Sequence, residues 1–391
     1  MARIAVLGAG IMGASTALLL AEAGCHTVLF DAAPEPLSGA SRWNEGKIHL
    51  GFLYAGDPSL ATARRVIPGG LAFAPLLSRL TGRDPRDAGG QAEDVYLAHR
   101  DSVVPPDAMA AYHQAVCGLL RDAGLREART RRLSGAELSA ISGSGSVSAG
   151  FAVPERSVDT RWVADRLAEA LAASPRLDLR CGVRVLAARP DGPEDGPWHV
   201  ATDPPEAGGR FDWVVNALWH GRPAVDATAG LPQEAAFTQR HRVSLFVRAP
   251  GVEERGALLA VGPFGDMKSY GGGRYYLSWY PAGLLVETVS AEVSDPPAPD
   301  AAAVIAGTRA GLSPLLPGAA RVLDAAEEVT VGGGWVFAVG RGSLADPASA
   351  LHRRDAFGLR RRGRYLSVDT GKYSTAPWLA ARIADAIGGA A

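Results

Sequence analysis

The sequence predicts an α/β protein with a Rossmann-type dinucleotide-binding domain and a second, discontinuous α+β domain that contains a large mixed or antiparallel sheet. Three observations predict this fold class. A glycine-rich turn joins a strand to a helix near the start, a helix and several strands follow from residue 158, and β-rich segments separated by Gly/Pro turns begin near residue 233. The 391 residues are enough for roughly two or three domains.

The first element is the apolar run Arg3–Leu7, which is typical of a parallel strand covered on both faces. Gly8, Gly10 and Gly13 follow it as G-x-G-x-x-G and lead into a helix predicted over 11–23. The first glycine permits a tight turn, the second lets a pyrophosphate approach the backbone, and the third lets the helix pack closely on the strand.

The amides that open this helix, at Ile11 and Met12, can face phosphates. A second strand is predicted over 27–30, and Asp31 follows it, 18 residues after Gly13. A carboxylate there can hold a ribose hydroxyl and would repel a 2′-phosphate, so FAD or NAD is favoured over NADP.

Two other interpretations of this stretch were weighed. A glycine turn can join strand to helix with nothing bound, and residues 4–21 carry no charge, as in a signal peptide. The glycines and the strand ending on Asp31 favour a retained nucleotide site instead.

Composition excludes several function classes. A net charge of −1 and a pI near 6.7 argue against binding to nucleic acid or to an anionic membrane. The three cysteines are few and widely spaced, so neither disulfides nor a metal site is expected. We expect a soluble, cytoplasmic protein.

Lysine usage is unusual. The 40 basic residues include only Lys47, Lys268 and Lys372. Where arginine has replaced nearly every lysine, a retained lysine indicates a need for a compact ammonium that can lose its proton. All three fall in segments that carry other active-site signals.

The remaining pattern gives the order of elements. Helices are predicted at 58–80 and 106–125, from 158–160 onward with apolar Val163, Leu167 and Leu171 on one side, and at 301–312. Strands are predicted at 94–97, 177–181, 183–187, 198–201, 211–219, 243–247, 257–261, 275–280, 284–289, 322–331 and 335–339. Pro314 and Pro317 are expected to end the fourth helix.

The end of the chain is predicted to form a strand over 364–369, a polar turn over 370–375 and a helix over 376–387. The partial positive charge of that helix N-terminus suits the pyrimidine edge of a reduced flavin. The six arginines between residues 353 and 364 are expected to form a solvated face. An anionic group on a larger substrate is the alternative.

Three stretches together resemble the D-amino acid oxidase superfamily of flavoproteins, which includes glycine oxidase and sarcosine oxidase. They are the first glycine turn, the segment Ser41-Arg42-Trp43-Asn44-Glu45-Gly46-Lys47-Ile48, and the turn and helix at the end of the chain. The resemblance implies FAD as the cofactor. It places along FAD the residues Gly8, Gly10, Ile11, Met12, Gly13, Asp31, Ser41, Arg42, Asn44, Gly46, Lys47, Ile48, Val183, Asn216, Ala217, Trp219, Gly340, Arg341, Gly371, Lys372, Tyr373, Ser374 and Thr375. Lys47 departs from the small residue usual in the family.

The resemblance also implies how the domains divide. The FAD-binding domain is expected to comprise residues 1–68, 150–234 and 340–391. The substrate-binding domain is expected to comprise residues 69–149 and 235–339.

The implied reaction is oxidation of a carbon–nitrogen bond in an amino acid or amine. Flavin accepts hydride, the imine hydrolyses, and O2 reoxidises the flavin to give hydrogen peroxide. Tyr276 would lie over the flavin and Arg341 would pair with the substrate carboxylate. The candidates for stabilising anionic flavin or activating oxygen are Lys268, Lys372, Lys47 and His49. The expected partners are a small substrate and O2, and the expected state is a monomer or small homo-oligomer.

Three alternatives remain open on the sequence. The first is an FAD-dependent dehydrogenase that oxidises a hydroxy acid, a sugar or a specialised biosynthetic intermediate and passes electrons to another acceptor. The second is an NAD-linked dehydrogenase, and the third is a non-catalytic nucleotide-binding protein.

Overall fold

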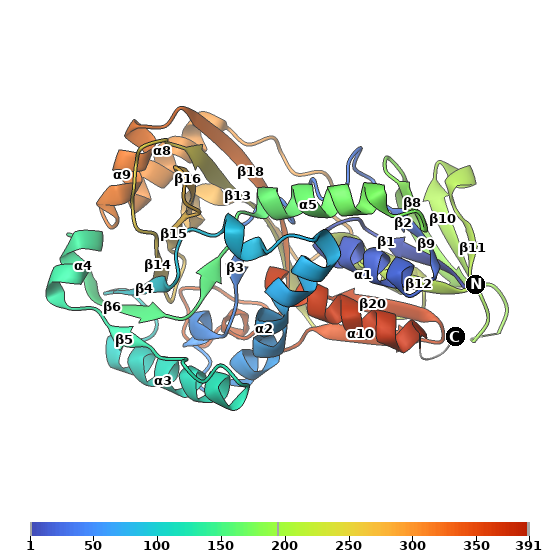
Figure 1. Cartoon of the computed structure of the whole chain (residues 1–391), viewed down its shortest axis with the longest axis horizontal. Coiled ribbons are helices and arrows are strands. Elements are labelled where there is room, and N and C mark those ends of the chain that lie inside the picture. The colour runs from blue at the N-terminus through green and yellow to red at the C-terminus, as the bar shows by residue number, and fades with distance from the viewer. Residues whose placement is uncertain (1, 194, 389–391) are drawn as a thin grey trace.

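The structure is a computed structural model that describes residues 2–193 and 195–388. It has two parts, each built around its own sheet (Figure 1). One part holds a six-stranded sheet and the other a nine-stranded sheet. No helix within 2–193 or 195–388 is long and apolar enough to cross a membrane.

The six-stranded sheet is parallel except for one edge strand. In spatial order its strands are β19 (Gly358–Arg362), β20 (Tyr365–Asp369), β12 (Trp213–Asn216), β1 (Arg3–Leu7), β2 (His26–Phe30) and β8 (Leu177–Arg180). Only β19 runs antiparallel to its neighbour. The predicted order of strand, helix and second strand at the start of the chain is confirmed.

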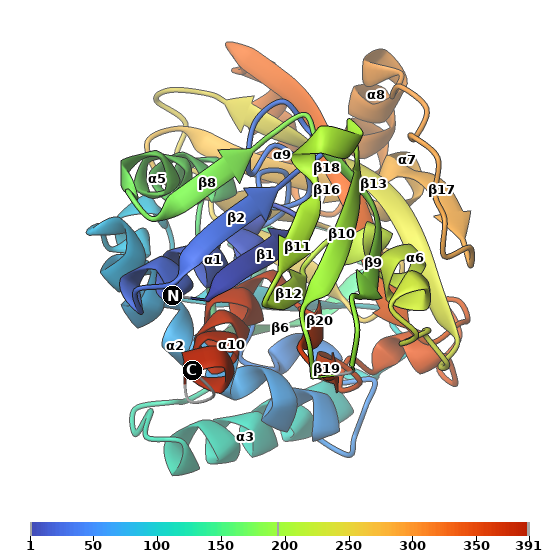
Figure 2. The ribbon, with the colours of Figure 1, turned by 90° about the vertical axis from the view of Figure 1, so that its right-hand side faces the viewer.

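Each face of this sheet is covered. The helices α1 (Ile11–Glu22), α5 (Thr160–Ala173) and α10 (Ala376–Gly388) bury apolar residues with Ile4 and Val6 on one face. On the other face, Ala5 and Leu7 pack with the three-stranded sheet formed by β9 (Arg184–Pro190), β10 (Trp198–Asp203) and β11 (Gly209–Phe211). Figure 2 faces this part of the molecule and shows β9, β10 and β11 beside the strands that they cover. Burial on both faces explains why β1 is apolar at nearly every position.

The nine-stranded sheet is mixed. Its strands, with β18 paired to β13, are β17 (Leu284–Thr288), β13 (Phe237–Arg248), β18 (Glu328–Val339), β16 (Arg274–Trp279), β15 (Gly265–Ser269), β14 (Ala257–Ala260), β4 (Asp94–His99), β6 (Val147–Val153) and β5 (Arg131–Arg132). The pairing of β14 with β4 is parallel and the others are antiparallel.

The outer face of the nine-stranded sheet packs on α8 (Ala301–Leu312) and α9 (Pro317–Asp324). At the other end of the sheet, α3 (Pro106–Asp122) contacts β6, and α4 (Gly135–Ile141) follows β5 (Figure 1). The long helix α2 (Ala61–Thr81) contacts both α3 and α10. It therefore bridges the two parts, and the boundary expected after residue 68 falls inside it.

The prediction for residues 313–339 is wrong in two places. Pro317 does not end the preceding helix but begins α9, where its fixed φ and missing N–H suit a first turn. The two predicted strands are one twelve-residue strand, β18, that pairs with β13 along its whole length.

The glycines at 332–334 explain the second error. A Cβ at Gly332 would lie 2.4 Å from the side chain of Trp43, and one at Gly334 would lie 2.6 Å from Ala40. These glycines therefore let the loop that contains Trp43 pack against β18, whereas the sequence pattern suggested a turn.

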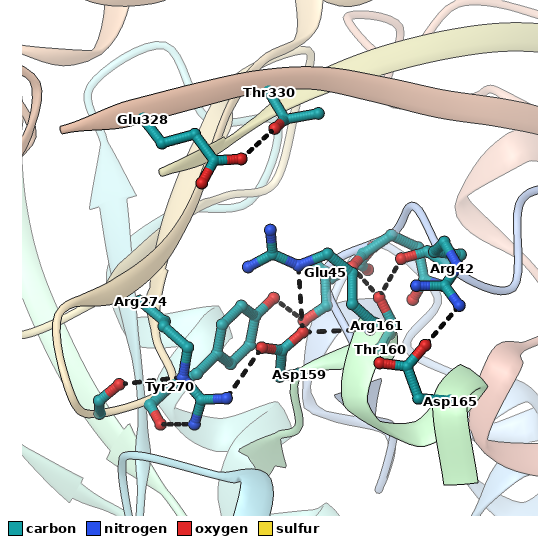
Figure 3. A network of polar contacts seen from close by, with 12 residues as sticks. Arg42, Glu45, Asp159, Thr160, Arg161, Asp165, Tyr270, Arg274, Glu328 and Thr330 are labelled. Atoms are coloured by element: carbon teal, nitrogen blue, oxygen red, sulfur yellow. Dashed lines mark hydrogen bonds and ion pairs between the residues drawn. The ribbon is translucent and has the colours of Figure 1, made fainter. Parts of the chain in front are cut away.

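A polar network fastens the hairpin of β15 and β16 to the start of α5 (Figure 3). Asp159 caps α5 by accepting from the backbone N–H of Arg161 at 3.0 Å, and Arg274 Nη1 lies 3.3 Å from the same carboxylate. Tyr270 donates its hydroxyl hydrogen to the backbone oxygen of Glu45 at 3.1 Å. The nine-stranded sheet is thus bonded to the loop before β3 (Lys47–Ile48).

Candidate active site

A cavity of about 940 Å³ lies between the two sheets. Its walls come from the carboxyl ends of β1 and β2, the loop over residues 37–49, the strand β18 and the turn before α10. Ligands of open α/β sheets bind outside the carboxyl ends of parallel strands. The volume is at the upper end of the roughly 300–1,000 Å³ typical of ligand pockets, which suits a large cofactor together with a substrate.

Asp31 organises the nucleotide end of the cavity. Its two carboxylate oxygens accept from the backbone N–H of Ala9 at 2.7 Å and of Ala33 at 2.8 Å. Burial raises the pKa of Asp31, and the two backbone hydrogen bonds oppose that shift. The carboxylate therefore positions the glycine turn, and its remaining lone pairs can accept from ribose hydroxyls.

The start of α1 leaves backbone exposed to the cavity. Gly10 is the N-cap and has no side-chain capping bond, while the amide of Ile11 donates to Ser41 Oγ at 2.9 Å. A Cβ on Gly13 would lie 1.8 Å from the carbonyl oxygen of Gly8, so only glycine permits this approach of α1 to the turn. The arrangement fits a pyrophosphate at the helix N-terminus.

The loop after Ser41 is shaped by internal hydrogen bonds. Asn44 Nδ2 donates to the oxygen of Ala40 at 2.8 Å, and Asn44 Oδ1 accepts from the amide of Gly46 at 2.9 Å. Gly46 has a φ of +62° and stands against the carbonyl of Val158, so it needs the freedom of glycine. Arg42 pairs instead with Asp165 at 2.6 Å (Figure 3).

Two of the three lysines meet at one carboxylate. Lys47 Nζ lies 2.6 Å and Lys268 Nζ lies 3.0 Å from Asp94 Oδ2, and all three side chains are buried. Glu155 Oε2 is 3.9 Å from Lys47 Nζ. Burial alone would lower the pKa of Lys47, but Asp94 and Glu155 raise it. The pKa of Lys268 is lowered because burial and the charge of Lys47 outweigh the attraction of Asp94.

The third lysine lines the cavity directly. Lys372 Nζ lies 5.5 Å from the ring centre of Tyr54, and burial together with the charge of Arg354 lowers the pKa of Lys372 to about 7. His49 is buried nearby, and its Nδ1 has no hydrogen-bond partner within the described residues. Burial and then the charge of Lys372 lower the pKa of His49 well below its usual value, so the imidazole is neutral.

Arg354 is the functional candidate that the sequence analysis missed. It lies in the loop before β19, lines the cavity, and donates from Nη1 to the oxygen of Phe337 at 3.1 Å. Burial and the nearby charge of Arg240 lower the pKa of Arg354 to about 10. The expectation of a solvated arginine face is therefore wrong for this residue, whereas its neighbour Arg353 is exposed. No local pattern separates the two, because β18 and the turn before α10 decide which one is enclosed.

Several predicted residues lie elsewhere. Arg341 is exposed in the loop after β18 and does not line the cavity. Tyr276 is buried against Phe246, and its hydroxyl oxygen accepts from Ser244 Oγ at 2.9 Å. Asn216 donates to Asp226 Oδ1 at 2.9 Å behind the sheet. Their predicted contacts with substrate or cofactor have no counterpart in the cavity lining.

The predicted residues divide into two groups by position. Those that line the cavity are Gly8, Gly10, Ile11, Met12, Asp31, Ser41, Asn44, Lys47, His49, Val183, Ala217, Trp219, Gly371, Lys372 and Tyr373. The others are Gly13, Arg42, Gly46, Ile48, Asn216, Lys268, Tyr276, Gly340, Arg341, Ser374 and Thr375. Some of the second group support the lining, as Ser374 does by accepting from the amide of His49 at 3.1 Å.

Trp219 and Val183 reach the cavity with part of their polar groups already engaged. Trp219 has a φ of +57° and donates from Nε1 to the oxygen of Trp335 at 2.7 Å, which joins the six-stranded part to β18. The amide of Val183 donates to the oxygen of Asp31 at 2.9 Å. A contact of Val183 with an adenine would therefore use its carbonyl group or its side chain.

Comparison with known proteins gives a family and a fold. A family model described as FAD dependent oxidoreductase matches residues 3–357. No curated protein matches the sequence.

Among solved structures, glycine oxidase from Geobacillus kaustophilus is 17% identical with a TM-score of 0.68, covering 98% of this chain and 94% of that one. Iminodiacetate oxidase from Chelativorans sp. BNC1 is 17% identical with a TM-score of 0.67, covering 99% and 95%. L-amino acid deaminase from Proteus vulgaris is 15% identical with a TM-score of 0.69, covering 100% and 94%.

Proposed function

Because the chain belongs to the family of FAD-dependent oxidoreductases, we propose that it oxidises a carbon–nitrogen bond of an amino acid or amine and uses O2 as the electron acceptor. The observation that carries this proposal is the cationic end of the cavity, where Arg354 and Lys372 stand together. The names of the similar structures, a glycine oxidase, an iminodiacetate oxidase and an L-amino acid deaminase, agree with a substrate of this class.

The cavity fits FAD. Gly10 and the amides at the start of α1 would receive the pyrophosphate, and Asp31 the ribose. The turn over 370–373 and the loop at Lys47 and His49 would border the flavin ring. Bound FAD supplies an acceptor for a hydride, and the protein supplies orientation and charge.

Arg354 would hold the substrate carboxylate. One of its five N–H donors is used by the oxygen of Phe337, and the guanidinium keeps others for a bidentate pair. Its lowered pKa of about 10 still leaves it charged at neutral pH. A fixed cation at this place would orient a bound amino acid by its carboxylate.

The same positive charges favour an uncharged amine. An ammonium group beside Arg354 would meet a like charge, so its pKa would fall and its lone pair would be available. Lys372 Nζ, with a pKa of about 7, can take up the proton that the substrate releases.

Lys372 is also our candidate for oxygen activation. A cation at its Nζ would stabilise the negative charge that develops on dioxygen. Lys47 and Lys268 are less suited to this task because Asp94 compensates both of them.

The proposal can be tested with the visible spectrum of the purified holoenzyme. Amino acids, secondary amines and hydroxy acids are added without oxygen, and bleaching of the flavin band is recorded before air is admitted and peroxide is measured. We expect an amine or amino acid to bleach the band and oxygen to restore it. Bleaching by hydroxy acids alone, or failure of O2 to restore the colour, would favour the dehydrogenase alternative.

A matched pair of variants tests the role of Arg354. Arg354→Met should raise the substrate concentration that gives half of the full bleaching at least tenfold. Arg353→Met should leave it unchanged, because Arg353 is exposed and paired with Asp355 at 2.5 Å. Equal behaviour of the two variants would remove Arg354 from substrate binding.

A further inference from the structure

Four basic side chains in or beside one end of the cavity have no acidic partner, and two of them, Arg354 and Lys372, line it. They are Arg240, Arg242, Arg354 and Lys372, and within residues 2–193 and 195–388 no Asp or Glu oxygen lies within 4.0 Å of their nitrogens. Uncompensated charge in a poorly solvated place costs several kcal/mol unless a partner arrives. Lys47 and Lys268 show the contrast, because Asp94 serves both.

The two arginines of β13 lie beside the cavity wall: neither lines the cavity, but the residues opposite them on β18 do. Arg240 pairs with Val336 and Arg242 pairs with Gly334 across β13 and β18, and both partners line the cavity. Residues opposite each other in an antiparallel pair point to the same face. Gly334 carries no side chain, and Ala40 packs where its Cβ would lie.

Arg354 joins this face from the other side. Its Nη1 is bonded to the oxygen of Phe337, the residue after Val336 on β18. The charge of Arg240 is the second cause, after burial, of the lowered pKa of Arg354, which is about 10. The three guanidinium groups therefore form one cluster around the middle of β18.

A neutral residue holds the pair on β13. Arg240 Nη1 donates to the hydroxyl of Tyr280 at 2.9 Å, and Arg242 Cζ lies 4.3 Å from the centre of the Tyr280 ring. The Nε atoms of both arginines are buried without a hydrogen-bond partner in the described part of the chain. Each guanidinium is thus held in place and still has donors to offer.

Several acidic groups lie near this cluster, and Glu292 and Asp295 are in the cavity lining. Asp369 accepts from the amide of Gly371 at 2.9 Å and lies 3.6 Å from Arg222 Nη2. Glu287, opposite Arg240 on β17, is exposed. Glu45 lines the cavity and raises the pKa of Lys372 slightly against the larger effects of burial and Arg354. Within residues 2–193 and 195–388, none of these carboxylates forms an ion pair with Arg240, Arg242 or Arg354.

We propose that the substrate carries a second anionic group besides the carboxylate beside its amine, and that Arg240 and Arg242 bind this second group while Arg354 binds the first. The favoured substrate class is an amino or imino dicarboxylic acid. A simple amino acid brings one carboxylate, which leaves two guanidinium groups without a counter-charge. The amine in this description rests on the proposed function above, but the pair of anions does not.

Binding can be tested without turnover. Propionate and succinate differ by one carboxylate, and each is titrated into the oxidised holoenzyme while the flavin spectrum is followed. We expect succinate to bind at least tenfold more tightly than propionate. In Arg240→Met the ratio of the two dissociation constants should fall at least fivefold, because the second carboxylate loses a charged donor.

Arg248→Met is the matched control. Arg248 ends the same strand, is exposed and pairs with Glu327, so its loss should leave the ratio unchanged. If Arg240→Met does not retain FAD, Arg242→Met replaces it with the same expectation. In 3-sulfopropionate a sulfonate replaces the second carboxylate, and a dissociation constant between those of propionate and succinate is expected.

Two results would overturn the inference. One is equal binding of succinate and propionate by the unchanged protein. The other is a variant of Arg240 or Arg242 that binds FAD more weakly, or has a shifted flavin spectrum without ligand, while the ratio of the propionate and succinate dissociation constants is unchanged. That result would assign the arginines to the cofactor. Amino dicarboxylic acids that bind but do not bleach the flavin would contradict the proposed amine oxidation and leave the two-anion site intact.

Discussion

Replacing Asp94 by asparagine tests the buried charge network directly. Asp94→Asn keeps the size of the side chain but removes the carboxylate that both Lys47 Nζ and Lys268 Nζ contact, at 2.6 and 3.0 Å. Glu155, at 3.9 Å from Lys47 Nζ, and Asp266, whose charge attracts Lys268, are then the acidic groups left near the two ammonium groups. Removing one partner from a buried ion pair costs about 3–5 kcal/mol. With two lysines depending on one oxygen, we expect a loss near the upper end of that range.

The pH dependence follows from the directions of the pKa shifts. Attraction from both lysines outweighs burial and lowers the pKa of Asp94, so its contribution to stability is present above the unfolded value near 3.8 and is lost as pH falls through the folded value. The pKa of Lys47 is raised, so its contribution is complete below the unfolded value near 10.5 and is lost as pH rises through the folded value. The difference between Asp94→Asn and the unchanged protein should therefore be largest between these limits.

The assay is urea unfolding of the holoenzyme at a fixed excess of FAD, since bound cofactor adds to apparent stability. Asp84→Asn is the control, because Asp84 makes an exposed pair with Arg86 at 2.5 Å and its loss should cost less than about 1 kcal/mol. If Asp94→Asn costs no more than Asp84→Asn, the shared carboxylate does not hold the network and the reasoning fails.

Three further predictions concern the cofactor and oxygen. Asp31→Ala should weaken FAD binding by about 10- to 100-fold, because it leaves two backbone amides of the turn without their acceptor. The control Asp212→Ala removes a similar bond to the amide of Arg3 outside the cavity and should not weaken FAD binding. Fluorescence titration of the apoprotein with FAD measures both. Gly13→Ala should abolish FAD retention, because the new Cβ would clash with the turn. In the control Gly118→Ala no atom lies within 4 Å of the new Cβ, and the free energy of unfolding should rise by about 1 kcal/mol. Thermal unfolding compares the two, and a Gly13→Ala protein as stable as the unchanged one would contradict the prediction. The rate of flavin reoxidation by O2, followed by stopped flow, should fall as pH rises through an apparent pKa at or above about 7. Lys372→Met should lose this pH dependence. If the variant keeps it, Lys372 does not have the proposed role.

The nucleotide end could be predicted because its signals are local. Gly8, Gly10, Gly13 and Asp31 lie within 24 residues, and the turn geometry that each glycine permits depends on its immediate neighbours. The predicted strands and helix on either side agree with the structure to within one residue. The acid at the end of β2 also binds backbone amides, a role that the motif did not reveal.

The substrate end could not be predicted because it is assembled from distant segments. Arg341 was chosen by its resemblance to a family motif, but the chain after β18 carries it to the surface, and Arg354 lies in the cavity instead. Arg240 and Arg242 precede the strand predicted at 243–247, and no prediction was made for them, whereas the structure includes both in β13. Only the register of β13 with β18 shows that their neighbours line the cavity.

Under the proposed function, the retention of Lys372 in an arginine-rich chain has a physical explanation. Lys372 has a pKa of about 7 at a place where a proton must come and go, whereas Arg354, with a pKa lowered to about 10 in the same surroundings, keeps its charge at neutral pH. An arginine at position 372 would be permanently charged and could not accept the proton of a substrate amine. Conversely, a lysine at position 354, subject to the same burial and the charge of Arg240, would lose its proton near neutral pH and release the carboxylate. The choice between the two cations thus follows the chemistry of each position, which is why a count of lysines led toward the site before any contact was known.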